Sequence, residues 1–159
     1  MKASETTLQP VFEGVKQYVI PLFQRTYSWK SKDWETLWDD LMDLYEANDD
    51  REHFMGAMVT MPVDMSPHGI NKYLLIDGQQ RLTTLFVLLA LIRDLDTTLA
   101  EQTNELYLVN KWETGTNRLK LLPTQTDQQA FAQIIDQKEP QEASELAKAY
   151  SFFRKRMQR

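Results

Sequence analysis

The chain contains the stretch Ile76-Asp77-Gly78-Gln79-Gln80-Arg81-Leu82-Thr83-Thr84-Leu85, which joins two apolar segments of different character. Residues 72–76 before the turn are short, apolar and aromatic, which is typical of a buried strand. Residues 82–95 are apolar on nearly every side, which predicts a buried helix. The first N–H groups of a helix lack internal partners and its dipole favours negative charge, so this junction is a place where an anion can bind.

Arg81 is the residue of this stretch that most favours a bound anion. A cation in the first turn of a helix costs about 0.3 kcal/mol or more, and that cost disappears when a phosphate is present. Gly78 lets a ligand approach the backbone, and Asp77 can cap the helix or hold a metal ion that accompanies phosphates. Gln79 and Gln80 can orient a water molecule or a ribose. The alternative is that Asp77 is only a cap and Arg81 only a partner in a surface ion pair.

A second polar pair lies in residues 20–29, the aromatic segment, which reads Ile-Pro-Leu-Phe-Gln-Arg-Thr-Tyr-Ser-Trp. Gln24 and Arg25 stand among its aromatic residues, and we interpret them as facing the same ligand as Arg81. The alternative is that Tyr27 and Trp29 are core anchors and Arg25 is a stacked structural cation.

The aromatic segment also suggests a surface for DNA. Phe23, Tyr27 and Trp29 offer apolar and aromatic area beside Arg25, so apolar contact would give discrimination among bases while the arginine contacts phosphate. Burial in the core is at least an equal alternative for Trp29, and a weaker one for Tyr27. The acidic helix expected over residues 33–50 repels DNA, so nucleic acid should approach from elsewhere.

Composition restricts the classes of function. The chain has 159 residues, no cysteine and a formal net charge of −5. Disulfides, thiolate metal sites and cysteine nucleophiles are therefore excluded, and a reducing cytoplasm fits. No secretory signal opens the chain, and the longest apolar run, residues 85–92, is too short to span a bilayer, so we expect a cytoplasmic protein without membrane association. His53 and His68 lie in expected turns, which argues against a histidine-based site.

Hydrophobic periodicity and turn residues predict the remaining elements. The expected further strands are 17–20, 54–61, 105–109 and 118–122, and 54–61 is expected to be central because it is apolar on both faces. Gly56 within it indicates a close approach by a ligand or a neighbouring element. Arg118 and Lys120 are interpreted as solvated cations of a half-exposed strand, with phosphate contact as the alternative.

The further helices are expected near the two ends of the chain. One begins with Ser31 as its N-cap and carries an apolar stripe from Trp34 to Tyr45. Another begins with Thr126 or Asp127 and runs to residue 135. A last one opens at Pro140 and places Leu146, Tyr150 and Phe153 on one stripe.

Both motifs, in this order, resemble the N-terminal domain of GmrSD-type modification-dependent restriction proteins. The more specific motif is Asp-Gly-Gln-Gln-Arg-Leu-Thr-Thr-Leu at residues 77–85, and the second is Pro-x-Phe-Gln-Arg-x-Tyr-x-Trp at residues 21–29. Weaker agreement comes from Phe-x-Gly at 54–56 and from Leu-Leu-Pro-Thr at 121–124 with Asp127 downstream. The resemblance covers most of residues 8–157.

The resemblance implies an α+β fold that is ParB/sulfiredoxin-like, with a small mixed sheet, packed helices and C-terminal helices. Residues 1–159 would form a single nucleotide-binding domain, with a core at 8–123 and the start of a helical region at 124–159. The last helix ends in Arg154-Lys155-Arg156 with nothing after residue 159 to cover its apolar face, so we expect this to be the N-terminal part of a longer protein.

The function implied is binding and hydrolysis of a nucleoside triphosphate with Mg²⁺, used to sense modified DNA and to regulate a nuclease in anti-phage defence. The nuclease would be a C-terminal helical and HNH-type domain or subunit, because no such motif is present in this chain. A homo-oligomer is left open by the sequence. The implied residues are catalytic Asp77, Gln79, Gln80 and Arg81; cofactor-binding Gln24, Arg25, Gly78 and Thr83; metal-binding Asp77; and DNA-binding Phe23, Arg25 and Tyr27.

Two other classes of function stay open. The domain can be a non-enzymatic ParB-like switch that binds nucleotide without much turnover. It can also be a protein-interaction or DNA-binding module that keeps the motif for structural reasons.

Overall fold

A computed structural model describes residues 3–48, 50–64, 67–140 and 143–159. Its helices and strands follow one another as α1 Leu8–Phe12, β1 Lys16–Val19, α2 Ser31–Ala47, β2 Val59–Asp64, β3 Asn71–Asp77, α3 Gln79–Leu95, α4 Ala100–Thr103, β4 Leu121–Leu122, α5 Gln125–Ile135 and α6 Glu145–Met157. A π-helical turn at Asn104–Leu108 and a 3₁₀ turn at Gly115–Arg118 lie between α4 and β4. None of the helices that the structure describes combines the length and the apolar character needed to cross a bilayer.

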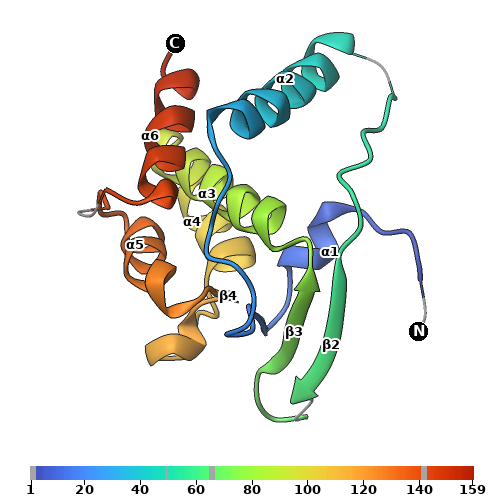
Figure 1. The fold of residues 1–159 in the computed structure, drawn as a ribbon, viewed down its shortest axis with the longest axis vertical. Helices are drawn as coiled ribbons and strands as arrows, with labels where there is room; N and C mark the ends of the chain where they lie inside the picture. The colour runs from blue at the N-terminus through green and yellow to red at the C-terminus, as the bar shows by residue number, and fades with distance from the viewer. Residues whose placement is uncertain (1–2, 49, 65–66, 141–142) are drawn as a thin grey trace.

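The strands form one mixed sheet in the order β2-β3-β1-β4. β1 runs parallel to both β3 and β4, whereas β2 pairs with β3 in the antiparallel sense. Figure 1 shows the β2–β3 pair extending away from the helices, with α3 starting where β3 ends. The expected α+β class, a small mixed sheet with packed helices, is confirmed.

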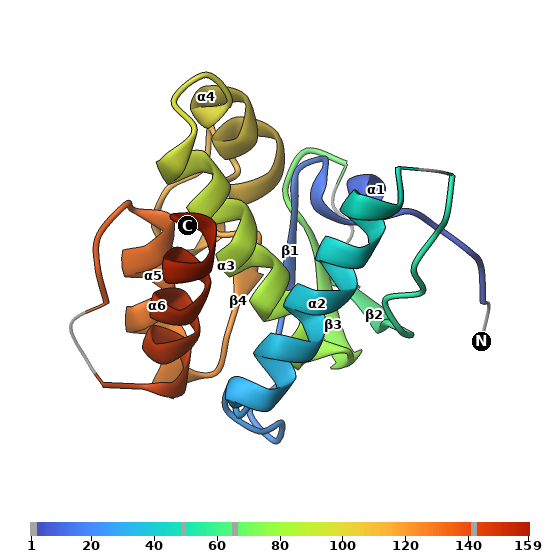
Figure 2. The ribbon, with the colours of Figure 1, turned by 90° about the horizontal axis from the view of Figure 1, so that it is seen from above.

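Helix α3 lies at the centre of the helical part. In Figure 2, α5 and α6 lie together on one side of it, and α2 lies on the other. Phe86 of α3 packs edge-on against Phe12, with ring centroids 4.8 Å apart, and against Phe131 of α5 at 6.0 Å. One cluster of buried side chains includes residues from α1, the sheet and every long helix, so residues on both sides of position 123 share a core.

The ends of the helices differ from expectation by a few residues. Lys30 is the N-cap of α2, so Ser31 is its first residue, and the Lys30 amide donates to Asp33 Oδ2 over 3.0 Å. Thr124 is the N-cap of α5. Ser144 caps α6 by accepting from the Ala147 amide, later than the expected start at Pro140. These shifts are small because several capping residue types stand near each start.

The expected apolar stripes of the two outer helices are largely confirmed. Leu146, Tyr150 and Phe153 of α6 are all buried. Trp34 is buried in α2, but Tyr45 is exposed because the last turns of α2 extend beyond the neighbouring helices.

The expected central strand at 54–61 is wrong. β2 begins only at Val59, and it lies at the edge of the sheet, with Met61 and Val63 exposed. Pro62 suits an edge position because it has no N–H to donate to a further strand. Gly56 has a left-handed φ of 99°, which ends any extended run before β2. An apolar run alone does not tell how many neighbours a strand has.

The two strands expected at 105–109 and 118–122 are also wrong in most of their length. Asn104–Leu108 continues α4 as a π-helical turn, and only Val109 forms an isolated bridge, to Leu119. The Leu106 carbonyl that a strand partner would have bound accepts instead from Lys120 Nζ over 2.7 Å. The strand β4 is therefore reduced to Leu121–Leu122.

Lys120 is neither a solvated cation nor available to a phosphate. Its side chain is 2 % exposed, and its Nζ donates to the carbonyls of Phe12 and Leu106, each over 2.7 Å. Burial, reinforced by repulsion from Lys16 and opposed by Glu13, lowers the pKa of Lys120 to about 8. Arg118 instead pairs with Asp136 at the surface.

The lowered pKa of Lys120 predicts a distinctive pH dependence of stability. Between pH 8 and 10.5 the unfolded chain binds more protons at this position than the folded one, so the free energy of unfolding rises with pH. We expect the stability of the wild type relative to Lys120→Met to increase across this window, by at most about 1.4 kcal/mol per pH unit. Urea unfolding at several pH values measures this difference. An equal rise in the stability of the wild type relative to the surface variant Lys32→Met would contradict the prediction.

Candidate functional site

The junction between β3 and α3 is built around a left-handed glycine. Gly78 has φ 93° and is the N-cap of α3, so no side chain caps this helix. Asp77 is exposed, and its Oδ1 accepts from the Gly78 amide over 2.9 Å. The possibility that Asp77 caps α3 is therefore wrong. A Cβ on residue 78 would lie 3.1 Å from the Ala57 carbonyl, so the turn needs glycine for space as well as for φ.

The aromatic segment meets this junction through glutamine side chains. Gln24 donates to the Ile76 carbonyl over 3.1 Å, and its own Oε1 accepts from Gln79 Nε2 over 2.9 Å. Gln80 accepts from the Ser28 amide over 2.8 Å and donates to the Thr26 carbonyl over 3.2 Å. The two motifs, which lie about fifty residues apart in the sequence, are thus hydrogen-bonded to one another.

Arg81 lies against two other parts of the chain. The central carbon of its guanidinium is 5.9 Å from the centroid of the Trp29 ring, which is a cation–π contact. A Cβ on Gly56 would fall 1.9 Å from Arg81 Nη1, so the guanidinium occupies the space that a side chain at 56 would fill. The close approach expected at Gly56 is therefore made by Arg81. In the described ranges, Arg81 forms no hydrogen bond or ion pair.

Tyr27 differs from expectation because it is buried rather than exposed. Its hydroxyl lies 2.7 Å from Thr84 Oγ1 and accepts from Trp34 Nε1 over 2.9 Å. Thr84 already donates its only hydroxyl hydrogen to the Gln80 carbonyl, so Tyr27 donates to Thr84. Burial raises the pKa of Tyr27, which keeps this donor protonated. A side chain so enclosed does not reach DNA in this structure.

The backbone of Tyr27 is held by a residue from the C-terminal helices. Its amide donates to Asp127 Oδ2 over 2.7 Å. Burial raises the pKa of the Asp127 carboxyl, against the lowering effect of this hydrogen bond. Neither Asp127 nor Thr84 was among the expected site residues; the position of Asp127 after Leu-Leu-Pro-Thr was the only signal that pointed to it.

The other expected site residues divide into enclosed and accessible ones. Thr83 is buried and donates its hydroxyl to the Gln79 carbonyl over 2.6 Å, and Gln79 is itself buried. Phe23, which is 78 % exposed, and Arg25 lie on the surface. Of the expected charged site residues, Asp77 and Arg25 are thus exposed and Arg81 is half-buried.

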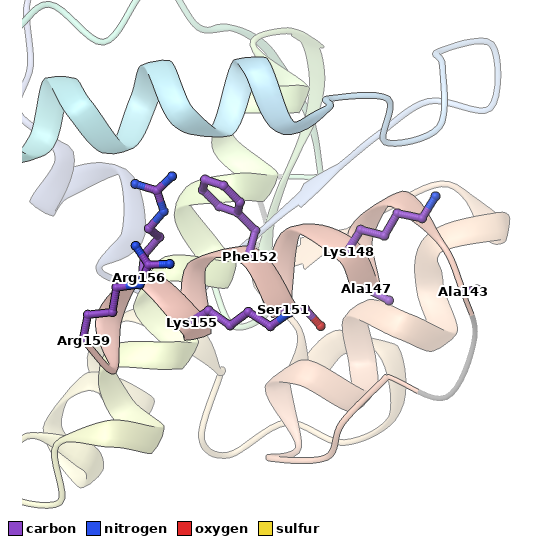
Figure 3. Close-up of a pocket in the computed structure, with 8 residues that line it drawn as sticks. All are labelled: Ala143, Ala147, Lys148, Ser151, Phe152, Lys155, Arg156 and Arg159. Atoms are coloured by element: carbon purple, nitrogen blue, oxygen red, sulfur yellow. The ribbon is translucent and has the colours of Figure 1, made fainter.

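Two hollows in the described surface lie away from this junction. One of about 510 Å³ follows α6 (Figure 3), and one of about 420 Å³ lies beside Arg93, Asn104 and Arg118. Neither is lined by residues of the two motifs.

Comparison with known proteins identifies the family. No curated protein sequence matches the chain. A family model described as "GmrSD restriction endonuclease, N-terminal domain" matches residues 8–158, which is nearly the whole chain and includes both motifs. Because this match spans every element of the fold and both halves of the junction, the chain belongs to the family of GmrSD restriction endonuclease N-terminal domains.

Proposed function

We propose that this domain binds a nucleoside triphosphate with Mg²⁺ at the β3–α3 junction and hydrolyses it to regulate a DNA restriction nuclease. Two observations carry the proposal: the two motifs are hydrogen-bonded at the junction, and Arg81 has no carboxylate partner among the described residues. In this proposal the nuclease is an HNH-type domain or subunit outside this chain. The chain belongs to a family of restriction endonuclease domains, and this supports a role in regulating a nuclease.

Arg81 is the proposed phosphate-binding residue. It lies in the first turn of α3, where the helix dipole makes a cation unfavourable unless an anion is present. Trp29 holds one face of the guanidinium, and Gly56 leaves room for it. Among the described residues, the amides of Gln79, Gln80 and Arg81 have no internal acceptor, as is usual at a helix start. Together these donors suit the oxygens of a phosphate chain.

Asp77 is the proposed residue for Mg²⁺ or for the attacking water. One of its carboxylate oxygens is bound by the Gly78 amide, which orients the group. Mg²⁺ commonly uses one or two protein carboxylates together with substrate phosphates and water, so a single aspartate fits an ion that arrives with the nucleotide. The described residues contain no group of three potential metal ligands that would form a protein cage. When bound, the ion would neutralise charge on the phosphates.

Gln24, Gln79 and Gln80 serve the proposed site as positioning residues. Their amides connect the aromatic segment to the start of α3, so they are occupied before any ligand arrives. This occupation favours the alternative of a nucleotide switch with little turnover, because only Asp77 of the motif remains to act on water. Arg25 and Phe23 flank Gln24 in the sequence and are exposed, and in the proposal they contact phosphate and a modified base of DNA, respectively.

Arg81→Gln should weaken nucleotide binding without unfolding the domain. Loss of the charged hydrogen bonds to phosphate is expected to lower affinity by about 10- to 100-fold. The readout is the shift in melting temperature with ATP or GTP plus Mg²⁺, compared with the wild type and with Arg159→Gln, an exposed arginine outside the junction, as the control. Equal shifts in the wild type and in Arg81→Gln, or no shift in the wild type at millimolar nucleotide, would contradict the proposal.

Measuring phosphate release distinguishes a domain that hydrolyses nucleotide from a switch that binds nucleotide with little turnover. If the domain hydrolyses nucleotide, Asp77→Asn should lower the rate of phosphate release by about 100-fold or more while affecting binding less. Binding by the wild type without release would favour the switch. The same measurement on Asp39→Asn, an acidic residue of α2 outside the junction, controls for the loss of a carboxylate.

Gly56→Ala tests the geometry around Arg81 through a second residue. The added methyl group would overlap Arg81 Nη1, and the left-handed φ costs an alanine about 1 to 2 kcal/mol. Gly115→Ala is a matched control, since Gly115 also has a positive φ but nothing lies within 4 Å of its Cβ position. We expect both variants to lose stability, and only Gly56→Ala to lose nucleotide affinity. Equal affinities in the two variants would show that the placement of Arg81 is irrelevant to binding.

A further inference from the structure

One face of α6 carries a line of cations that the β3–α3 site does not use. The shallow hollow of about 510 Å³ along this helix is lined by Ala143, Ala147, Lys148, Ser151, Phe152, Lys155, Arg156 and Arg159. Four of these eight residues are basic and none is acidic, although the whole chain has a net charge of −5. We call this set of lining residues the α6 stripe.

Among the residues that the structure describes, half of these cations have no ion-pair partner. Lys148 pairs with Glu145 at 3.1 Å, and Arg156 pairs loosely with Glu35 of α2 at 3.6 Å. Lys155 and Arg159 are exposed and form no ion pair with any residue in the described ranges. Figure 3 shows Phe152 and Arg156 directed toward α2, with Ser151 and Lys155 on a different side of the helix. Free positive charge is therefore concentrated where the acidic helix α2 does not cover it.

Helix stability by itself does not explain the stripe. Cations in the last turn of α6 do favour its dipole, which accounts for Lys155 and Arg156. Lys148 lies near the start of the helix, where a cation gains nothing from the dipole, and Arg159 lies beyond its end. Small side chains at 143, 147 and 151 keep the space between the cations open.

The dimensions of the stripe match a nucleic-acid backbone. From Ala147 to the end of the helix at Met157 the helical rise gives a length of about 15 Å. One strand of B-form DNA presents a phosphate for about every 3.4 Å along its axis, so the helical part of the stripe can follow about four phosphates. Small residues between Lys and Arg side chains suit contact with a backbone rather than reading of base edges.

We propose that the α6 stripe binds the phosphodiester backbone of double-stranded DNA, through Lys155 and Arg159 and without regard to sequence or base modification. The choice of duplex DNA as the polyanion rests on the proposed role in restriction, whereas the stripe itself is separate from the nucleotide-binding junction. Affinity for DNA would come from α6, and discrimination of modified bases would come from elsewhere.

The test compares two double variants that change net charge equally. Lys155→Gln/Arg159→Gln removes the unpaired cations of the stripe, and Lys32→Gln/Lys138→Gln removes two exposed lysines outside it. Binding of this chain to a short unmodified duplex is measured by fluorescence anisotropy at several salt concentrations. The stripe variant should lower affinity by about tenfold or more at low salt and reduce the slope of log K against log salt by about 1.8, which corresponds to two phosphate contacts. The control should leave both values near those of the wild type.

The outcomes also separate this inference from the proposed nucleotide site. The stripe variant should retain the nucleotide-dependent thermal shift of the wild type, while Arg81→Gln should retain binding to unmodified duplex. Equal losses in the stripe variant and the control would mean that only overall charge matters, and would overturn the inference. Unchanged DNA binding in a folded stripe variant, as expected if the stripe contacts a protein partner, would overturn it too, as would an absence of duplex binding by the wild type at low salt.

Discussion

Burial of α3 is the constraint on which the rest of the structure depends. Side chains on nearly every side of this helix are enclosed, including Phe86, Val87 and Leu91, so helices and sheet must surround it. Its first turn lies where β3 delivers the chain through Gly78, and Gln80 and Arg81 there are half-buried. The place where a ligand can meet the unpaired amides of α3 is therefore set by the core.

A network of buried hydrogen bonds connects α3 to the aromatic segment. Trp34 of α2 donates to Tyr27, Tyr27 donates to Thr84 of α3, and Asp127 of α5 binds the Tyr27 amide. Three helices thus fix one tyrosine, and the glutamines of the motifs fix the residues on either side of it. Because buried polar groups lose free energy when they lack partners, the network is satisfied only when all four elements are in place. Movement of the aromatic segment would consequently disturb the hydrogen bond between the Tyr27 amide and Asp127 of α5.

Cations serve three different purposes in this domain. Arg93 and Lys120 are buried and donate to backbone carbonyls, Arg93 to the Ile134 and Ile135 carbonyls at the end of α5 and Lys120 to those of Phe12 and Leu106. Arg81 is half-buried on an aromatic ring beside unpaired amides. The cations of the α6 stripe are largely exposed. Residue type does not separate these purposes, since lysine and arginine occur in more than one of them; burial and partners do.

Much of this protein is determined by local sequence pattern. The short apolar run before Asp77, the glycine after it and the fully apolar helix that follows predict β3, the turn and α3, and the structure agrees within about three residues. The same holds for β1, for the apolar stripe of α6 and for the special role of Gly56. These features are readable because strand and helix periods, and the need for a positive φ, are properties of neighbouring residues.

Other features were decided only by the tertiary structure. Alternation of apolar and basic residues at 118–121 is the same for a half-exposed strand and for a segment whose lysine is buried, and carbonyls from Phe12 and Leu106 decide between them. Likewise an aromatic residue at 27 suits a DNA surface or a core, and Trp34, Thr84 and Asp127 place it in the core. Gln79 and Gln80 have side chains able to bind a ligand, yet both are hydrogen-bonded to the aromatic segment. In each case the deciding partner is distant in sequence, so local pattern contains no information about it, and only the packing around α3 brings the groups together.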